Sequence, residues 1–133
     1  MKKNIDKEKE LRVSTGATKK VYLVDAADKK LGRVASQIAT YLTGKNTTGY
    51  VRNMYPNISV QVTNASKMAI DEKKSGSKTY KFFSGYPGGL REETLENLAN
   101  RQGYAEILRK AVYGMVPSNR LRSRIMKNLT ITE

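Results

Sequence analysis

The most distinctive chemistry in this sequence belongs to the basic side chains between Arg109 and Lys127. This stretch contains six Lys and Arg residues and no acidic residue. A solvated helix face usually mixes acids and bases one turn apart, so a set without acids favours phosphate binding over contact with solvent alone. Arg also forms forked hydrogen bonds to phosphate oxygens and stacks on bases, which suits folded RNA. The six residues are Arg109, Lys110, Arg120, Arg122, Arg124 and Lys127.

The segment Gly114-Met115-Val116-Pro117 lies in the middle of this basic stretch and is predicted to separate two helices. Alternate residues on a helix are about 200° apart, so Arg120, Arg122 and Arg124 cannot share one face. We therefore interpret the segment as a corner that directs the bases of two helices at different RNA strands.

A second candidate anion site is the glycine-rich segment Gly85–Gly89, which could hold a phosphate through its backbone N–H groups. The spacing is equally compatible with a tight loop that binds nothing. Lys81 and Arg91 flank the segment, so its anion could be a nucleotide or an RNA phosphate. Tyr86 is a candidate for stacking on a base.

Gly44-Lys45-Asn46-Thr47 is similar to the end of a phosphate-binding loop, but the match fails twice. Ala39 stands where the first Gly is required, and Asn46 stands where Ser or Thr should bind Mg²⁺. We interpret Gly44 as the end of a helix and Lys45 as a phosphate contact. Arg33 is a further candidate contact.

Catalytic chemistry has few candidate residues, because cysteine and histidine are both absent. Their absence excludes disulfides, thiolate nucleophiles, His general bases and the common zinc sites. Asp25 and Asp28 follow a predicted strand, but two carboxylates without a nucleophile or metal partner are more typical of a turn. We predict a protein that is not an enzyme, with no metal, no cofactor and no small-molecule substrate.

The overall charge points to a polyanionic partner. Lys and Arg number 25 against 12 acids, giving a formal charge of +13, and self-repulsion at this charge disfavours a compact isolated chain. Nucleic acid is the first candidate partner and an anionic membrane surface the second. No apolar run is long enough to span a membrane, and the N-terminus lacks the apolar region of a secretory signal, so we expect a cytoplasmic protein.

The elements that must position these residues follow from hydrophobic periodicity. Residues 21–24 form an apolar run typical of a strand buried on both faces, and residues 58–63 alternate as a strand with one buried face. The patterns also predict helix 31–42, strands 68–70, 79–83 and 129–132, and a polar loop at 71–77. Three further helices are expected. The first follows the glycine loop and starts near Glu92 and Glu93, the second comes after Gly103, and the third is capped by Ser118.

This order predicts an α/β domain with a small, largely parallel sheet covered by helices on both faces. The domain occupies residues 20–133. Residues 1–19 mix basic and acidic side chains with little apolar periodicity, and we interpret them as a basic N-terminal arm.

Three motifs resemble those of a known family, the universal large-subunit ribosomal proteins numbered thirteen in the bacterial scheme. Val24–Ala35 with Gly44-Lys45 after it resembles the family's opening strand and helix. Gly85–Leu90 resembles its central glycine loop, and Val112–Leu121 resembles its C-terminal signature. The similarity runs from about Val21 to Thr132, with the three motifs in the family's order. Arg122 stands where the family usually has a small residue.

The resemblance implies a three-layer α/β/α fold with a four-stranded, mainly parallel sheet. It implies a structural constituent of the large ribosomal subunit that binds large-subunit rRNA, contacts neighbouring ribosomal proteins and supports early subunit assembly and translation. Two alternatives remain open at this point. One is a small α/β enzyme that binds a nucleotide at Gly85–Gly89, and the other is a free RNA-binding regulator.

Overall fold

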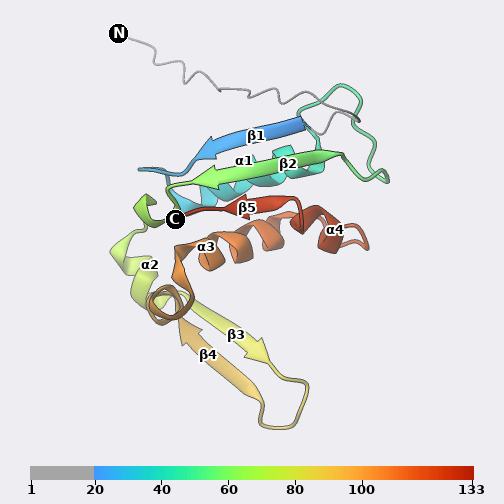
Figure 1. The fold of residues 1–133 in the computed structure, drawn as a ribbon. Coiled ribbons are helices and arrows are strands. Elements are labelled where there is room, and N and C mark those ends of the chain that lie inside the picture. Colours follow the sequence, from blue (N-terminus) through green and yellow to red (C-terminus); the bar gives the residue numbers. More distant parts are fainter. Residues whose placement is uncertain (1–19) are drawn as a thin grey trace.

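The computed structural model describes residues 20–133, so the predicted arm at residues 1–19 lies outside the described residues (Figure 1). The elements, in chain order, are β1 (Lys20–Asp25), α1 (Leu31–Thr43), β2 (Ile58–Thr63), the 3₁₀ turn η1 (Ala65–Lys67), α2 (Glu72–Ser77), β3 (Thr79–Phe83), β4 (Leu90–Thr94), α3 (Leu95–Met115), α4 (Arg122–Met126) and β5 (Leu129–Ile131). The prediction of a mixed α/β fold is confirmed.

The main sheet contains three parallel strands in the order β1-β2-β5. The central strand, β2, alternates as its sequence predicts: Ile58, Val60 and Val62 are buried, whereas Gln61 is exposed. Their side chains meet α1, whose Val34, Ile38 and Leu42 recur at helical spacing and are also buried. The parallel β1–α1–β2 unit therefore forms as the hydrophobic pattern requires.

Among the described residues the main sheet has three strands, which corrects the expected number of four. β3 pairs instead with β4 in a separate antiparallel hairpin, with Phe83 opposite Leu90 and Lys81 opposite Glu92. Gly85 and Gly88 adopt positive φ values of 88° and 76°, which lets the chain reverse between the two strands. The glycine segment thus closes a hairpin.

Residues 90–94 were expected to start a helix, and they form strand β4. Glu92 and Glu93 therefore lie on β4, and α3 begins only at Leu95, after Thr94. The Thr94 hydroxyl accepts a hydrogen bond from the Asn97 N–H at 3.4 Å, which provides the N-terminal cap. Because a strand separates Gly85–Gly89 from this helix, the glycine segment has no adjacent helix N-terminus with which to hold a phosphate.

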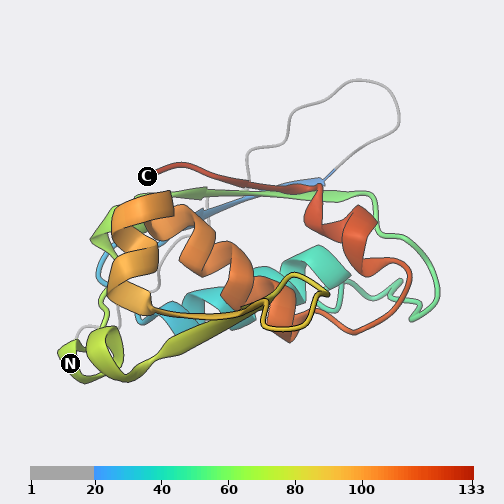
Figure 2. The ribbon, with the colours of Figure 1, turned by 90° about the horizontal axis from the view of Figure 1, so that it is seen from below.

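Helices α1 and α3 lie on the same face of the sheet, as Figure 2 shows. The opposite face carries Leu23, Gln61 and Thr130, which are exposed. Within residues 20–133, helices therefore cover only one face of the sheet, and two layers are found where three were expected. The physical reason is that the segment between β2 and α3 folds as α2 and the hairpin, so no helix crosses to the other face.

Two smaller segments also differ from expectation. Residues 68–70 contribute one isolated bridge, between Lys30 and Ala69, in place of a strand. Residues 72–77 form the short helix α2 where a polar loop was predicted. Both segments are short enough that tertiary contacts outweigh local propensity.

Helix α3 is kinked at Gly103, which confirms the predicted separation of two helices there. Gly103 has φ 81°, a left-handed value that ends the first helical segment. The Ala105 N–H, in the first turn of the second segment, donates to the Glu133 carboxylate at 3.0 Å. The side chain of the last residue of the chain thus caps the second half of α3.

The corner, residues 114–121, consists of the last two residues of α3 and the connection to α4. The last helical residue of α3 is Met115, and α4 begins only at Arg122. Ser118 is therefore not the predicted N-cap; the Asn119 side chain instead accepts from the Leu121 N–H at 3.1 Å and forms a tight turn. Arg120 lies in this turn, outside any helix.

Candidate nucleic-acid interface

Among residues 20–133, one end of the molecule carries basic side chains and no acidic ones. We call it the basic end and define it as Lys20, the loop 44–57, the corner 114–121 and the segment 122–128. The acid-free stretches behind it run from residue 29 to 70 and from residue 107 to 132. The three parallel strands start at this end (Figure 1), whereas Asp25, Asp28 and Glu133 lie near their other ends. The fold therefore concentrates positive charge at the amino edge of the sheet.

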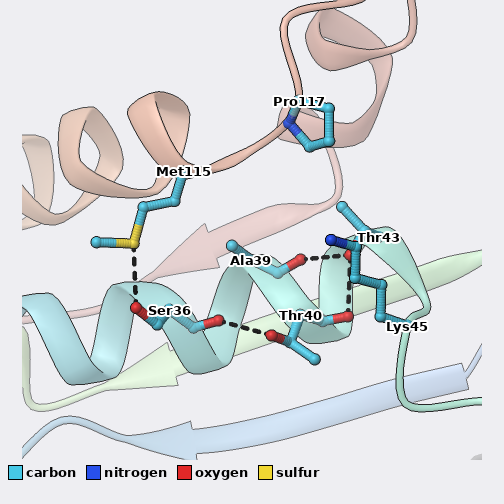
Figure 3. Close-up of a pocket in the computed structure, with 7 residues that line it drawn as sticks. All are labelled: Ser36, Ala39, Thr40, Thr43, Lys45, Met115 and Pro117. Atoms are coloured by element: carbon cyan, nitrogen blue, oxygen red, sulfur yellow. Dashed lines mark hydrogen bonds between the residues drawn. The ribbon is translucent and has the colours of Figure 1, made fainter.

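Lys45 belongs to the basic end because α1 stops beside the corner. Gly44, at φ 75°, terminates α1 in the left-handed conformation, which confirms it as the helix end. Lys45 follows the negative end of the helix dipole and lines a hollow of about 250 Å³ together with Met115 and Pro117 (Figure 3). The Ser36 hydroxyl, which donates to the Met115 sulfur at 3.3 Å, joins α1 to the end of α3. Lys45 is thus brought to the predicted basic stretch despite its distance along the chain.

Arg122 supports the corner from within. Its guanidinium carbon lies 4.4 Å from the centroid of the Tyr113 ring, and its Nε–H donates to the Pro117 carbonyl at 3.3 Å. These contacts connect the last turn of α3 to the first residue of α4. Arg122 is therefore engaged in contacts within the corner itself.

The loop 44–57 is held to α4 through Tyr55. The Asn128 amide donates to the Tyr55 hydroxyl at 2.6 Å, and this hydroxyl lies 3.5 Å from the Arg124 carbonyl, to which it donates. The Arg124 guanidinium lies 5.0 Å from the Tyr55 ring centroid in a cation–π contact, and within residues 20–133 it has no carboxylate partner. Arg120 and Lys127 are exposed and, like Arg124, take part in none of the three ion pairs of residues 20–133.

Three other predicted binding residues are engaged within the molecule. Lys81 pairs with Glu92 across the hairpin at 2.9 Å, and Arg109 pairs with Glu106 on α3 at 3.6 Å. The Lys110 amine lies 3.6 Å from the centroid of the Phe82 ring and joins α3 to the hairpin. These contacts neutralise or occupy the three basic side chains, none of which belongs to the basic end as defined above.

The remaining predicted residues are exposed but dispersed. Tyr86, with 74% of its surface exposed, lies in the turn of the hairpin, and Arg91 lies on β4 beside it. Arg33 lies in the first turn of α1, roughly 20 Å from Lys45 at the rise of 1.5 Å per residue. The structure therefore brings together Lys45, Arg120, Arg122, Arg124 and Lys127, and leaves the other predicted residues apart from them.

Asp25 serves a turn, as its sequence context predicted. Its carboxylate accepts hydrogen bonds from the Asn64 amide at 2.9 Å and from the Ala27 N–H at 3.1 Å. The Asn64 hydrogen bond, followed by that from Ala27, lowers the pKa of Asp25 below its usual value. Asp28 adopts a positive φ of 57° in the same turn. This pair joins β1 to α1.

Sequence reasoning missed Lys20, Tyr50, Arg52 and Tyr55, which belong to the basic end. Residues 50–57 have no hydrophobic periodicity that would predict a helix or a strand. The absence of acids from residue 29 to 70 is the signal that would have included this loop.

Among the described residues, no helix is long and apolar enough to cross a membrane.

Comparison with known proteins identifies relatives of the whole described region. The family model of ribosomal protein L13 matches residues 19–133. The chain is 43% identical over 114 residues to the large ribosomal subunit protein uL13 of Citrifermentans bemidjiense, covering 86% of this chain and 80% of the relative. It is 37% identical over 134 residues to the protein of the same name in Chlamydia pneumoniae, covering 100% of this chain and 89% of the relative.

Proposed function

The chain belongs to the ribosomal protein L13 family, and we propose that it is a structural constituent of the large ribosomal subunit whose basic end binds large-subunit rRNA. Its role is not enzymatic, and its place in the cell is the cytoplasmic ribosome. Through this binding it supports early subunit assembly and translation, and neighbouring ribosomal proteins are its further partners. The family membership supports neither a nucleotide-binding enzyme nor a free regulator.

The observation that carries the assignment of the rRNA surface is the convergence of the two acid-free stretches. Loop 44–57 and segment 122–128 are far apart in sequence, yet Tyr55 joins them through Asn128 and Arg124. A surface built from two separate segments without any acid carries only positive side-chain charges, which an RNA backbone neutralises.

The mechanism is displacement of counterions by fixed cations. Each phosphate contact releases condensed counterions, so affinity falls as the salt concentration rises. Arg120, Arg124 and Lys127 supply the principal contacts, and Lys45 adds a contact beside the corner. Arg122 keeps the corner in shape, so that the cations on its two sides hold RNA segments at a fixed separation.

Other predicted residues form a secondary set. Arg33, Arg91 and Tyr86 are exposed outside the basic end and contact more distant parts of the rRNA. Lys81, Arg109 and Lys110 contribute mainly through the intramolecular contacts described above. Residues 20–133 act as one rRNA-binding domain, with residues 1–19 as a basic arm.

The experiment compares two double variants that each remove two positive charges. Arg120→Gln/Lys127→Gln alters the basic end, and Lys73→Gln/Lys74→Gln alters the exposed helix α2 as a matched control. Binding to purified large-subunit rRNA is measured across a salt series. We expect the first variant to reduce the slope of log affinity against log salt by about 1.8, at about 0.9 for each phosphate contact on a duplex, and the control to change it little.

Equal slopes for the two variants would refute the assignment of rRNA to the basic end. Membership of the subunit is tested separately by sedimentation. The protein should migrate with large subunits after a high-salt wash, and a protein recovered only in the soluble fraction would contradict the structural role.

A further inference from the structure

A hollow in the basic end lies between the loop 44–57 and the amino ends of β1 and β2. Its volume is about 280 Å³, and the residues that matter here are Lys20, Gly44, Tyr50, Met54, Tyr55 and Pro56. Pockets for drug-sized ligands measure roughly 300–1,000 Å³, so this hollow suits a smaller group. Its lining combines two aromatic rings, a thioether and a proline, with Lys20 among the lining residues.

We propose that this hollow, here named the base pocket, receives one unpaired base of the bound RNA. The proposal rests on the proposed function and adds to it a contact with a base, where the cations of the basic end contact phosphates. Proteins that recognise single-stranded or bulged RNA commonly stack its bases on aromatic side chains.

The walls of the base pocket are held in place by the surrounding fold. Tyr55 is fixed by the hydrogen bond from Asn128 and by the Arg124 guanidinium. The Asn46 amide donates to the Tyr22 hydroxyl at 3.0 Å, which fastens the start of the loop to β1. Tyr22 in turn stacks on Tyr41, with ring centroids 4.6 Å apart. Because the Tyr55 ring is held in place, it loses little conformational entropy when a base stacks on it.

The exposed lining explains why a ligand is expected. Met54 is 66% exposed, and Tyr50, Val51 and Tyr55 are each more than a third exposed. Together they form an apolar patch within the basic end. An apolar protein partner would leave these cations without counter-charge, whereas an RNA base arrives with a phosphate on each side. Lys20, which lines the hollow, and Arg124, which lies over the Tyr55 ring, can meet those phosphates.

The test uses the full chain and two oligomers of equal length and charge. One is a short oligoadenylate, and the other is a ribose-phosphate oligomer without bases. Wild-type protein should prefer oligoadenylate, because only this oligomer can fill the base pocket. Tyr50→Ala should weaken binding to oligoadenylate by roughly five- to one-hundred-fold and leave binding to the abasic oligomer unchanged. Tyr50→Phe should behave like wild type, since it retains the ring.

A matched control is Leu23→Ala, which truncates another exposed apolar side chain on the open face of the sheet. It should retain the preference for oligoadenylate. Equal preference in wild type and Tyr50→Ala would overturn the base pocket, as would an equal loss in Tyr50→Phe. Failure of the proposed function has a different result: neither oligomer would lose affinity on Arg120→Gln/Lys127→Gln. Thermal unfolding of each variant verifies that the fold is kept.

Discussion

Arg122 provides the sharpest test of whether a basic side chain positions the corner or binds phosphate. Replacing it with Ala removes the cation–π contact with Tyr113 and the hydrogen bond to the Pro117 carbonyl. An exposed cation–π contact contributes about 0.5–1 kcal/mol, and a typical hydrogen bond contributes about 0.5–1.5 kcal/mol. The free energy of unfolding should therefore fall by about 1–2.5 kcal/mol.

The matched control is Arg120→Ala. This variant also removes one positive charge. Arg120 lies two residues before Arg122, is exposed and forms no ion pair among residues 20–133. Its effect on the free energy of unfolding should stay within about 0.5 kcal/mol. Chemical denaturation followed by circular dichroism measures both variants, and the shared loss of one charge cancels the change in overall self-repulsion.

RNA binding supplies the second measurement for Arg122. Arg122→Lys keeps the charge but not the planar group that stacks on Tyr113. It should therefore lose most of the stability that the Arg122 contacts contribute and keep the wild-type salt slope. Arg120→Ala should keep the stability and reduce the slope by about 0.9. A fully stable Arg122→Ala whose salt slope falls as much as that of Arg120→Ala would refute the positioning role and make Arg122 a phosphate contact.

Two further predictions concern the fold. Gly103→Ala should destabilise the protein by at least about 1 kcal/mol in denaturant titration, because φ is 81° there and the new Cβ would meet the Glu133 carboxylate that caps Ala105; an unchanged midpoint would contradict the assignment of this kink to glycine. Asp25 has a pKa lowered by the Asn64 and Ala27 hydrogen bonds, so its contribution to stability is complete above its usual pKa of 3.8 and is lost as the pH falls through the lower folded-state value. Asp25→Asn should remove this part of the acid-induced loss of stability, and identical pH dependence in both proteins would disprove the stabilising role of the carboxylate.

Local patterns predicted elements correctly where a single rule applies to neighbouring residues. The alternation in residues 58–63 predicts one buried face of β2, and the helical spacing from Leu31 to Leu42 predicts the buried stripe of α1. Gly44 and Gly103 were recognised as helix boundaries because a left-handed residue there strongly favours glycine. Propensity failed for residues 90–94: Glu92 suited a helix start, but cross-strand pairing with Lys81 placed it in a strand.

The sequence by itself determined the nature of the partner. A charge of +13, the absence of His and Cys, and the acid-free stretch ending at residue 132 favour a polyanion and disfavour catalysis, because charge and chemical type are fixed by composition. Tertiary structure decided which cations lie near one another. It placed Lys45 beside the corner, assigned Lys110 to the Phe82 ring and Arg122 to Pro117, and joined Tyr55 to α4. These contacts depend on how segments far apart in the chain pack on one face of the sheet, which no local pattern encodes.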